Sequence, residues 1–446
     1  MIKHETELSY FSLLKFFLPL AATPVLIGLA HSIANATLAR LPYPELSIAV
    51  FAVVRGITMI CSSPSLLSLQ LVVSFVDEPS SYRLINRFNW VLGLMLCLIL
   101  SALAYTPLGK VVFTRLVGLT EPRQIAYAYA GLRITCFLPL VQVLRNHYQG
   151  LALSLKKTGL FVPGIVIRLL FISFFLWWTV HSQAVLGIFA VALSWVVGIG
   201  IEGIFIVISL LYDSGSVKKV LNSLPPKDGK RPSLGEVIKF FIPLAVMMSL
   251  TAFAEPAVQG GLARSALATQ SLAVYGVAWS LVMLLNSPLR PLHQLSLVYT
   301  RGTDDPNWNL VKMFSLISGL VISLLTIILA LTPIGFWLLN TVIAVSREIT
   351  LLVMKVLLVF SVYPIIRSLR ETYWGLMMGW RNTFFIAISK LVNIGLVVVV
   401  LIISLTIVNL HPAVIGALAF ITGEIVESLL IWQFSCRNSA QSLGKN

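Results

Sequence analysis

The sequence predicts an all-α polytopic membrane protein with about twelve transmembrane helices. Of its 446 residues, 58% are hydrophobic and only 11% are charged, whereas a soluble domain carries about 25% charged residues. The apolar runs are long and continuous, as at residues 396–403, whereas β-barrel strands show only a weak alternation. At about 20 apolar residues per span plus connecting loops, the chain length accommodates roughly twelve helices. A water-soluble enzyme is excluded.

Glycine, proline and charged residues divide the apolar runs into two sets of six helices. The first set is predicted at residues 11–38, 46–75, 84–105, 125–151, 160–180 and 184–212. The second set is predicted at residues 234–262, 272–299, 310–339, 350–377, 383–407 and 413–434. We therefore expect an N-terminal bundle over 1–213, a basic linker over 214–232 and a C-terminal bundle over 233–446. The linker cations are Lys218, Lys219, Lys227, Lys230 and Arg231.

The distribution of Lys and Arg among the loops predicts the orientation. With the N-terminus inside, the cytoplasmic segments hold fourteen cations and the outer segments hold six, and cationic loops stay in the cytoplasm. Both termini are therefore expected to be cytoplasmic. The net charge of +15 does not indicate nucleic-acid binding, because an embedded chain offers little free surface to a duplex. We expect a monomer in the lipid bilayer of a bacterial inner membrane.

The strongest signal is an internal duplication. Residues 15–21 (Lys-Phe-Phe-Leu-Pro-Leu-Ala) recur at 239–245 (Lys-Phe-Phe-Ile-Pro-Leu-Ala), and Arg145 recurs as Arg370. Six helices per copy is an even number, so the two copies enter the membrane in the same direction. Parallel repeats of this kind enclose a central cavity and can expose it alternately to each side. The duplication favours a carrier, although membrane enzymes and channels also contain repeats.

These openings of the first and seventh helices, together with the six-plus-six repeat, resemble the MOP superfamily of multidrug extrusion (MATE) pumps and polysaccharide flippases. Residues 370–383 (Arg-Glu-Thr-Tyr-Trp-Gly-Leu-Met-Met-Gly-Trp-Arg-Asn-Thr) and 255–264 (Glu-Pro-Ala-Val-Gln-Gly-Gly-Leu-Ala-Arg) are similar to segments of the progressive ankylosis family. That resemblance implies export of small polyvalent anions such as citrate, pyrophosphate and nucleotides. The multidrug branch would instead imply efflux of organic cations in exchange for Na⁺ or H⁺.

Ionisable residues inside the predicted spans are mainly cationic. A charge at the bilayer centre costs about 2.5–3.5 kcal/mol, so such residues are expected to face a cavity. An interior of this sign would bind carboxylates or phosphates and repel cationic drugs. The nine cations are Arg55, Arg133, Arg145, Arg168, Arg290, Lys355, Arg367, Arg370 and Lys390, against the five acids Glu202, Glu255, Glu371, Glu424 and Glu427.

Arginine side chains are the first candidates for a substrate site. Arg367 and Arg370 share one helix face, and Arg145 is the repeat mate of Arg370, so these three are expected to receive an anion in the cytoplasmic half. In the alternative interpretation Arg370 pairs with a neighbouring acid and locks helices, while Arg145 extends to the interface. Arg55 and Arg168 have no charged repeat mates, which favours a role in specificity.

A second group of candidates lies on the first and seventh helices. His31 and Asn35 are one turn apart, and the repeat aligns them with Glu255 and Gln259. The position of Glu255 resembles that of the acidic residue that multidrug pumps use for ion coupling. We therefore expect Glu255 and His31 to couple Na⁺ or H⁺, and Asn35 and Gln259 to contact substrate. A salt-bridged Glu255 and a packing histidine are the structural alternatives.

Several motifs are missing from the sequence. It contains no Walker motif, no nucleophile elbow and no metal-binding histidine pair, so we expect no enzymatic activity, no metal and no cofactor beyond a coupling ion. Transport would then depend on an ion gradient. The sequence thus predicts a secondary transporter that exports small polyvalent anions. The alternatives are Na⁺- or H⁺-coupled multidrug efflux, a flippase for an anionic lipid-linked sugar, and a polytopic membrane enzyme.

Overall fold

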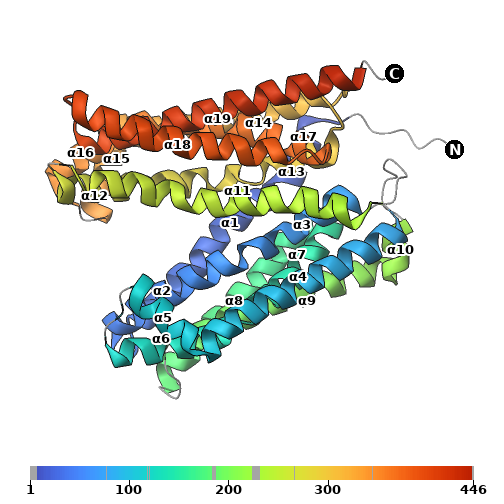
Figure 1. Ribbon diagram of the computed structural model, residues 1–446, viewed down its shortest axis with the longest axis horizontal. Coiled ribbons are helices and arrows are strands. Elements are labelled where there is room, and N and C mark those ends of the chain that lie inside the picture. Colours follow the sequence, from blue (N-terminus) through green and yellow to red (C-terminus); the bar gives the residue numbers. More distant parts are fainter. Residues whose placement is uncertain are drawn as a thin grey trace. The chain divides into compact units, whose positions relative to one another are not determined.

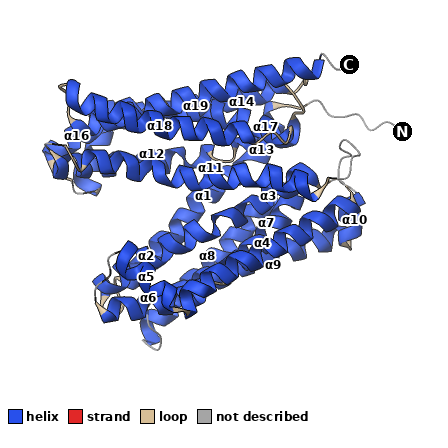
Figure 2. Ribbon diagram, in the orientation of Figure 1, coloured by secondary structure: helices blue, strands red, loops and turns tan. Residues whose placement is uncertain are grey.

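The computed structural model describes residues 8–76, 78–117, 119, 121–182, 187–222, 232–265, 267–343 and 345–443. Within these residues every regular element is a helix (Figure 2). Twelve segments are long and apolar enough to cross a membrane. The predicted all-α fold with twelve transmembrane helices is therefore confirmed.

The first six spans contain several short elements beside the long helices (Figure 1). Spans two and four each consist of two helices, whereas spans one, three, five and six are each built on one long helix. In chain order the elements are α1 (Tyr10–Leu38), α2 (Pro44–Ser62), η1 (Ser63–Leu67), α3 (Ser68–Phe75), α4 (Pro79–Tyr105), α5 (Pro107–Val111), η2 (Val112–Leu116), α6 (Pro122–Thr135), α7 (Leu138–Ser154), η3 (Thr158–Leu160), α8 (Phe161–Ser182), α9 (Gly187–Ser214) and α10 (Val217–Asn222).

The last six spans repeat this order. The elements are α11 (Leu234–Leu262), α12 (Ala268–Asn286), η4 (Ser287–Leu289), α13 (Leu292–Tyr299), α14 (Trp308–Leu331), α15 (Pro333–Trp337), η5 (Leu338–Val342), α16 (Arg347–Phe360), α17 (Tyr363–Gly379), α18 (Phe384–Ile407) and α19 (Pro412–Leu443). Of the predicted linker, Lys218 and Lys219 lie in α10, whereas Lys227, Lys230 and Arg231 lie outside the described residues.

Prolines explain where the discontinuous spans break. A proline lacks the backbone N–H and clashes with the preceding turn, so a new helical segment starts there. Pro64 begins η1 within the second span, and Pro288 occupies the same place in η4. Pro139 and Pro364 likewise stand in the first turn of α7 and α17. The ninth span ends at Leu331, earlier than predicted, because a separate helix starts at Pro333.

The chain forms two compact units, Ala22–Phe241 and Met1–Ala21 with Ile242–Asn446. The start of α1 therefore belongs to the unit that holds most of the second repeat, and the start of α11 belongs to the unit that holds most of the first repeat. Ring contacts within each unit fix these segments. Phe16 and Phe17 of α1 contact Tyr299 and Phe314 at centroid distances of 5.0 and 5.5 Å. A central cavity stays a prediction.

The same repeated motif makes the equivalent contacts in the other unit. Phe240 and Phe241, the repeat mates of Phe16 and Phe17, contact Phe75 and Phe88 at 5.1 and 5.4 Å. All four pairs are edge-on, a geometry that stabilises aromatic pairs by about 0.5–1.5 kcal/mol beyond burial. The motif that marks the duplication in the sequence therefore anchors the start of the first helix of each repeat.

Candidate functional site

A buried charge cluster lies in the unit Ala22–Phe241, between α7, α8 and α9. Glu202 of α9 is fully buried. Its Oε2 atom accepts hydrogen bonds from Nη1 of Arg168 at 3.2 Å and from Nη1 of Arg145 at 3.5 Å. Its Oε1 atom accepts a hydrogen bond from Nε2 of Gln149 at 3.0 Å. Two guanidinium groups therefore face one carboxylate. We call these four residues the N-terminal cluster.

Glycines allow the three helices to approach closely at this cluster. A Cβ atom added to Gly203 of α9 would lie 3.3 Å from Cα of Arg145, and one added to Gly198 would lie 3.2 Å from Cγ of Arg168. Arg145 also donates from Nη2 to the Oδ1 atom of Asn146 at 2.9 Å. These contacts hold both arginine side chains in place inside the bundle.

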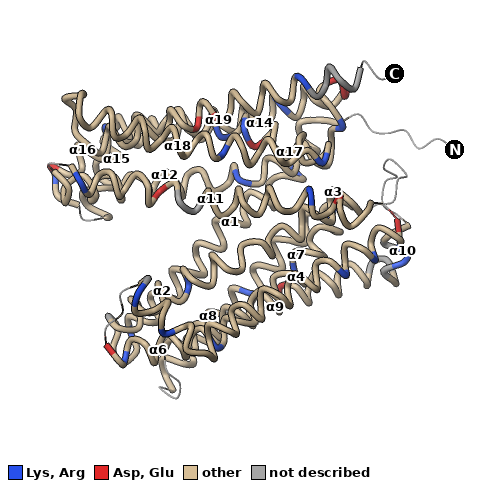
Figure 3. Tube along the Cα trace, in the orientation of Figure 1, with Lys and Arg blue, Asp and Glu red and all other residues tan. Residues whose placement is uncertain are grey.

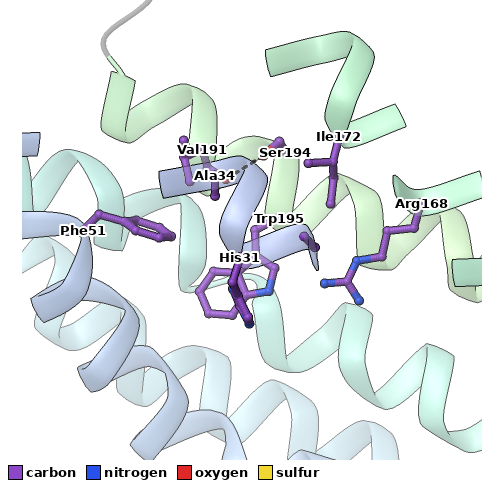
Figure 4. Close-up of a pocket in the computed structure, with 9 residues that line it drawn as sticks. His31, Ala34, Phe51, Arg168, Ile172, Val191, Ser194 and Trp195 are labelled. Carbon is purple, nitrogen blue, oxygen red and sulfur yellow. Dashed lines mark hydrogen bonds between the residues drawn. The ribbon is translucent and has the colours of Figure 1, made fainter. Parts of the chain in front are cut away.

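A small pocket lies beside Arg168. Figure 4 shows the guanidinium group of Arg168 directed toward the rings of His31 and Trp195. The ring of Trp195 packs edge-on against His31 and Phe51, at centroid distances of 6.1 and 6.4 Å. The complete lining is Ala30, His31, Ala34, Phe51, Arg168, Ile172, Val191, Ser194 and Trp195. The wall of the pocket is therefore largely apolar and carries one permanently charged group.

A second charge cluster lies between α17, α18 and α19. Both Glu424 and Glu427 are buried, and they stand one turn apart on α19. Lys390 lies 3.2 Å from Oε1 of Glu424 and 3.1 Å from Oε2 of Glu427. Arg370 pairs directly with Glu424 and lies 3.5 Å from Glu427. Asn393 donates to Glu424 at 3.1 Å. Two cations here face two carboxylates.

Glu371 extends this second cluster toward α13. Its Oε2 atom lies 3.0 Å from Nδ1 of His293, and its Oε1 atom lies 3.6 Å from both Arg367 and Arg370. The guanidinium group of Arg370 also lies over the ring of Trp374 at 4.7 Å. Arg367 therefore adds one cation and Glu371 one acid. We call Arg367, Arg370, Glu371, Lys390, Glu424 and Glu427 the C-terminal cluster, and its three cations balance its three acids.

The two clusters contain one repeat-related ion pair each. Arg145 and Glu202 in the first repeat correspond to Arg370 and Glu427 in the second. Around this shared pair the repeats differ, because Arg168 corresponds to the uncharged Asn393. Figure 3 shows how few other cations and acids lie within the spans of either unit. Of the two clusters, only the N-terminal one therefore has more cations than acids.

The structure brings several predicted substrate residues together. Arg145 and Arg168 share Glu202, and Arg367 and Arg370 share Glu371. Arg55 is half-buried and forms no ion pair with any residue that the structure describes. For Arg370, the contacts favour the interpretation in which it pairs with neighbouring acids. The substrate roles of all five arginines stay predictions.

The residues predicted for ion coupling lie in two different units. His31 is half-buried in the pocket beside Arg168, whereas Asn35 is exposed. Glu255 is half-buried and accepts a hydrogen bond from Nε2 of Gln259 at 2.9 Å. No salt bridge joins Glu255 to an arginine among the described residues. Within the same residues no group of His, Cys, Asp and Glu side chains could hold a metal ion.

Sequence reasoning did not identify three contributors to these sites. Gln149 lies one helical turn after Arg145, a spacing that places both side chains on one face. His293 had no such signal, because its partner Glu371 lies on another helix. Trp195 lies in an apolar run, where the sequence does not separate a pocket wall from ordinary packing.

The chain is similar to a known protein family and to several solved structures. The family model described as progressive ankylosis protein (ANKH) matches residues 230–439. The fold is similar to that of a MOP superfamily transporter from Pyrococcus furiosus, described with a binding pocket of reversed polarity, at a TM-score of 0.73 and 11% identity over 97% of this chain and 96% of that chain. It is also similar to an outward-facing multidrug resistance MATE transporter, at a TM-score of 0.73 and 12% identity over 97% and 96%.

A third solved structure, of a MATE protein in complex with MaL6, matches at a TM-score of 0.73 and 11% identity, over 98% of this chain and 97% of that chain. The first two of these solved structures are described as transporters, and their likeness to this chain shows its fold. The resemblance predicted from the repeated motif is therefore confirmed. The chain has the twelve-helix fold of the MOP superfamily transporters, and residues 230–439 match the progressive ankylosis protein family.

Proposed function

We propose that the chain is a secondary transporter that exports small anionic solutes by alternating access of its two repeats. The observation that carries this proposal is the excess positive charge of the N-terminal cluster. Arg145 and Arg168 are both buried and share the single carboxylate of Glu202. Removing charges from water is costly unless each is balanced. An anionic group of a bound solute would supply the missing balance.

The C-terminal cluster supports the same assignment by contrast. Its cations are matched by acids, so it gains no charge balance from an anionic ligand. Arg370 contacts two carboxylates and the ring of Trp374, so acids of the same cluster already balance its charge. In this proposal Arg145, Arg168 and Arg55, which forms no ion pair among the described residues, contact the solute. Arg370 holds α17 against α19, and Arg367 pairs with Glu371 within α17.

The finer identity of the solute follows from the sign of this charge. Citrate, pyrophosphate and nucleotides are the first solutes to test, because guanidinium groups bind carboxylates and phosphates with paired hydrogen bonds. Cationic drugs would be repelled by the same cluster. Glu255, hydrogen-bonded to Gln259 and outside any described salt bridge, is the proposed site of Na⁺ or H⁺ coupling.

Flux measurements on the purified chain in liposomes test the proposal. Labelled citrate, pyrophosphate and a nucleotide should each be compared with a cationic dye and an anionic lipid-linked sugar. Arg168→Asn introduces the residue found at the equivalent position of the second repeat, and should reduce anion flux at least about tenfold. Arg133→Asn is the matched control, because Arg133 is exposed over Tyr105 and Tyr129 and its removal also deletes one cation.

Each outcome of this experiment is informative. Anion flux that falls in Arg168→Asn and persists in Arg133→Asn supports the proposal. Flux of the dye alone would favour the multidrug alternative, and movement of the lipid-linked sugar alone would favour the flippase. Equal anion flux in the wild type and in Arg168→Asn would assign the N-terminal cluster to packing.

A further inference from the structure

The pocket beside Arg168 has the composition of a site for one negative charge. Six of its lining residues are apolar or aromatic, and none of the described lining residues is acidic. The polar members are Arg168, His31 and Ser194. The hydroxyl group of Ser194 donates to the carbonyl oxygen of Val191 at 2.8 Å, so Arg168 is the one permanent charge in the wall.

Arg168 has hydrogen-bonding capacity that the described residues do not use. Its side chain is 3% exposed, and its Nη1 atom donates to Glu202. Its Nε atom is buried and has no hydrogen-bond partner among the described residues. A buried donor on a charged group costs more than about 1–3 kcal/mol when it has no partner. Because Arg168 lines the pocket, a ligand there would lie beside a charged side chain whose hydrogen-bonding capacity is incomplete.

Glu202 does not neutralise Arg168 fully, because it also accepts hydrogen bonds from Arg145 and Gln149. One carboxylate thus serves two guanidinium groups, and one elementary positive charge remains. A monovalent anion restores the neutrality of the N-terminal cluster itself, whereas a multiply charged group would need a further cation such as Arg55 to avoid a costly excess of buried negative charge.

The size of the pocket narrows the ligand further. The pocket is small and partly open, so an intact citrate or nucleotide does not fit inside it, whereas a single ion or one end of a solute can enter from the open side. We propose that the pocket binds one small monovalent anion at Arg168, which is either a free chloride ion or a single carboxylate group of the transported solute. This inference rests on the proposed function, because it assigns the charge and size that the anion site accepts.

The repeat predicts that each chain has one such site. Asn393 stands where Arg168 would be in the second repeat, and its amide donates to Glu424. The C-terminal cluster is also balanced without a ligand. A measured stoichiometry of one anion per chain is therefore expected.

Chloride is the probe that tests the site on the purified full-length protein. Binding is measured by calorimetry and by the shift in melting temperature, with sodium chloride or sodium bromide titrated against sodium sulfate at constant ionic strength. Chloride and bromide should bind at one site per chain and raise the melting temperature. Sulfate should not bind at this site, because its charge exceeds that of the pocket.

Two variants test whether chloride binds in this pocket. Ala34→Leu fills the pocket without changing any charge, and Arg168→Asn removes the cation. Both should weaken chloride binding at least about tenfold. Ala36→Leu is the matched control, because Ala36 is exposed on the same helix two residues away, and it should bind chloride like the wild type. Unchanged chloride binding in Ala34→Leu would overturn the inference, even if Arg168→Asn failed to fold.

Competition between citrate and chloride distinguishes a carboxylate of the solute from a free ion. It also tests this inference separately from the proposed function. A solute carboxylate in the pocket predicts that citrate displaces chloride, whereas a free-ion site predicts that chloride and citrate bind together. Absence of chloride binding with intact anion transport would overturn this inference and leave the proposed function standing. Chloride binding without transport of any anionic solute would overturn the proposed function and leave the pocket assignment standing.

Discussion

Replacing Glu202 by glutamine should expose the charge imbalance of the N-terminal cluster most directly. At an effective dielectric constant of about 20, a carboxylate at 3.2 or 3.5 Å from a guanidinium nitrogen gains about 5 kcal/mol from each of Arg168 and Arg145 before desolvation is counted. The variant loses both attractions and leaves two buried cations without a counterion. Since breaking a buried ion pair costs about 3–5 kcal/mol, Glu202→Gln should destabilise the protein by at least that much.

The reasoning also predicts a partial rescue. Arg168→Asn leaves Arg145 and Glu202 as a one-to-one pair, the arrangement that Arg370 and Glu427 have in the second repeat. That variant should cost less than Glu202→Gln. Adding Arg168→Asn to Glu202→Gln removes one of the two stranded cations, so the double variant should be more stable than Glu202→Gln by about 0.5–3 kcal/mol.

Melting curves of the purified variants in detergent, followed by tryptophan fluorescence, measure these differences. Arg168→Asn should be at least as stable as the wild type, because it removes the unbalanced cation, and the double variant and then Glu202→Gln should be less stable than both. Two results would refute the reasoning. One is a Glu202→Gln protein as stable as the wild type, and the other is a double variant whose loss equals the sum of the single losses.

Two further predictions concern other parts of the chain. Gly375→Ala should abolish recovery of folded protein in size-exclusion chromatography, because the new Cβ would lie against the carbonyl oxygen of His293, whereas Gly276→Ala, with nothing within 4 Å, should fold normally; equal recovery of both would contradict the close packing. His411 lies between α18 and α19, where burial and then the nearby Lys355 lower its pKa. Since the unfolded chain still takes up a proton near pH 6.5, stability should fall as the pH drops below about 6.5 and level off beneath the lowered pKa, and His411→Gln should melt with a shallower dependence on pH.

The apolar pattern of the sequence predicts most of the fold. The spans Leu46–Phe75 and Leu234–Leu262 begin and end where the sequence places them, the ninth ends at Leu331 instead of residue 339, and the other spans differ by a few residues at their ends. Apolar length is sufficient here because a membrane helix must satisfy its backbone hydrogen bonds within itself. The breaks within the fourth and tenth spans were not predicted, although Pro139 and Pro364 occupy matching positions of the repeat where α7 and α17 begin.

The charge count predicts the candidate site less well. It treats every cation inside a span as part of one positive interior, yet Arg133, Arg290 and Lys355 are exposed. Helical spacing shows which residues share one face of one helix, but not which helix packs against that face. The pairing of Lys390 on α18 with Glu427 on α19 therefore follows from tertiary packing, which a single sequence does not specify.

The difference between the two repeats supports a binding role for the extra buried arginine more strongly than the total charge of the spans does. Both repeats keep a buried arginine and glutamate pair, and the second repeat adds Lys390 and Glu424 as a further balanced pair. The first repeat instead adds Arg168 without an acid. A buried, unbalanced cation is costly to the folded state, and violations of local packing rules concentrate at functional sites. Because the second repeat has the same helices with an asparagine at that position, we propose that the fold does not require Arg168 and that this cation serves to bind an anion.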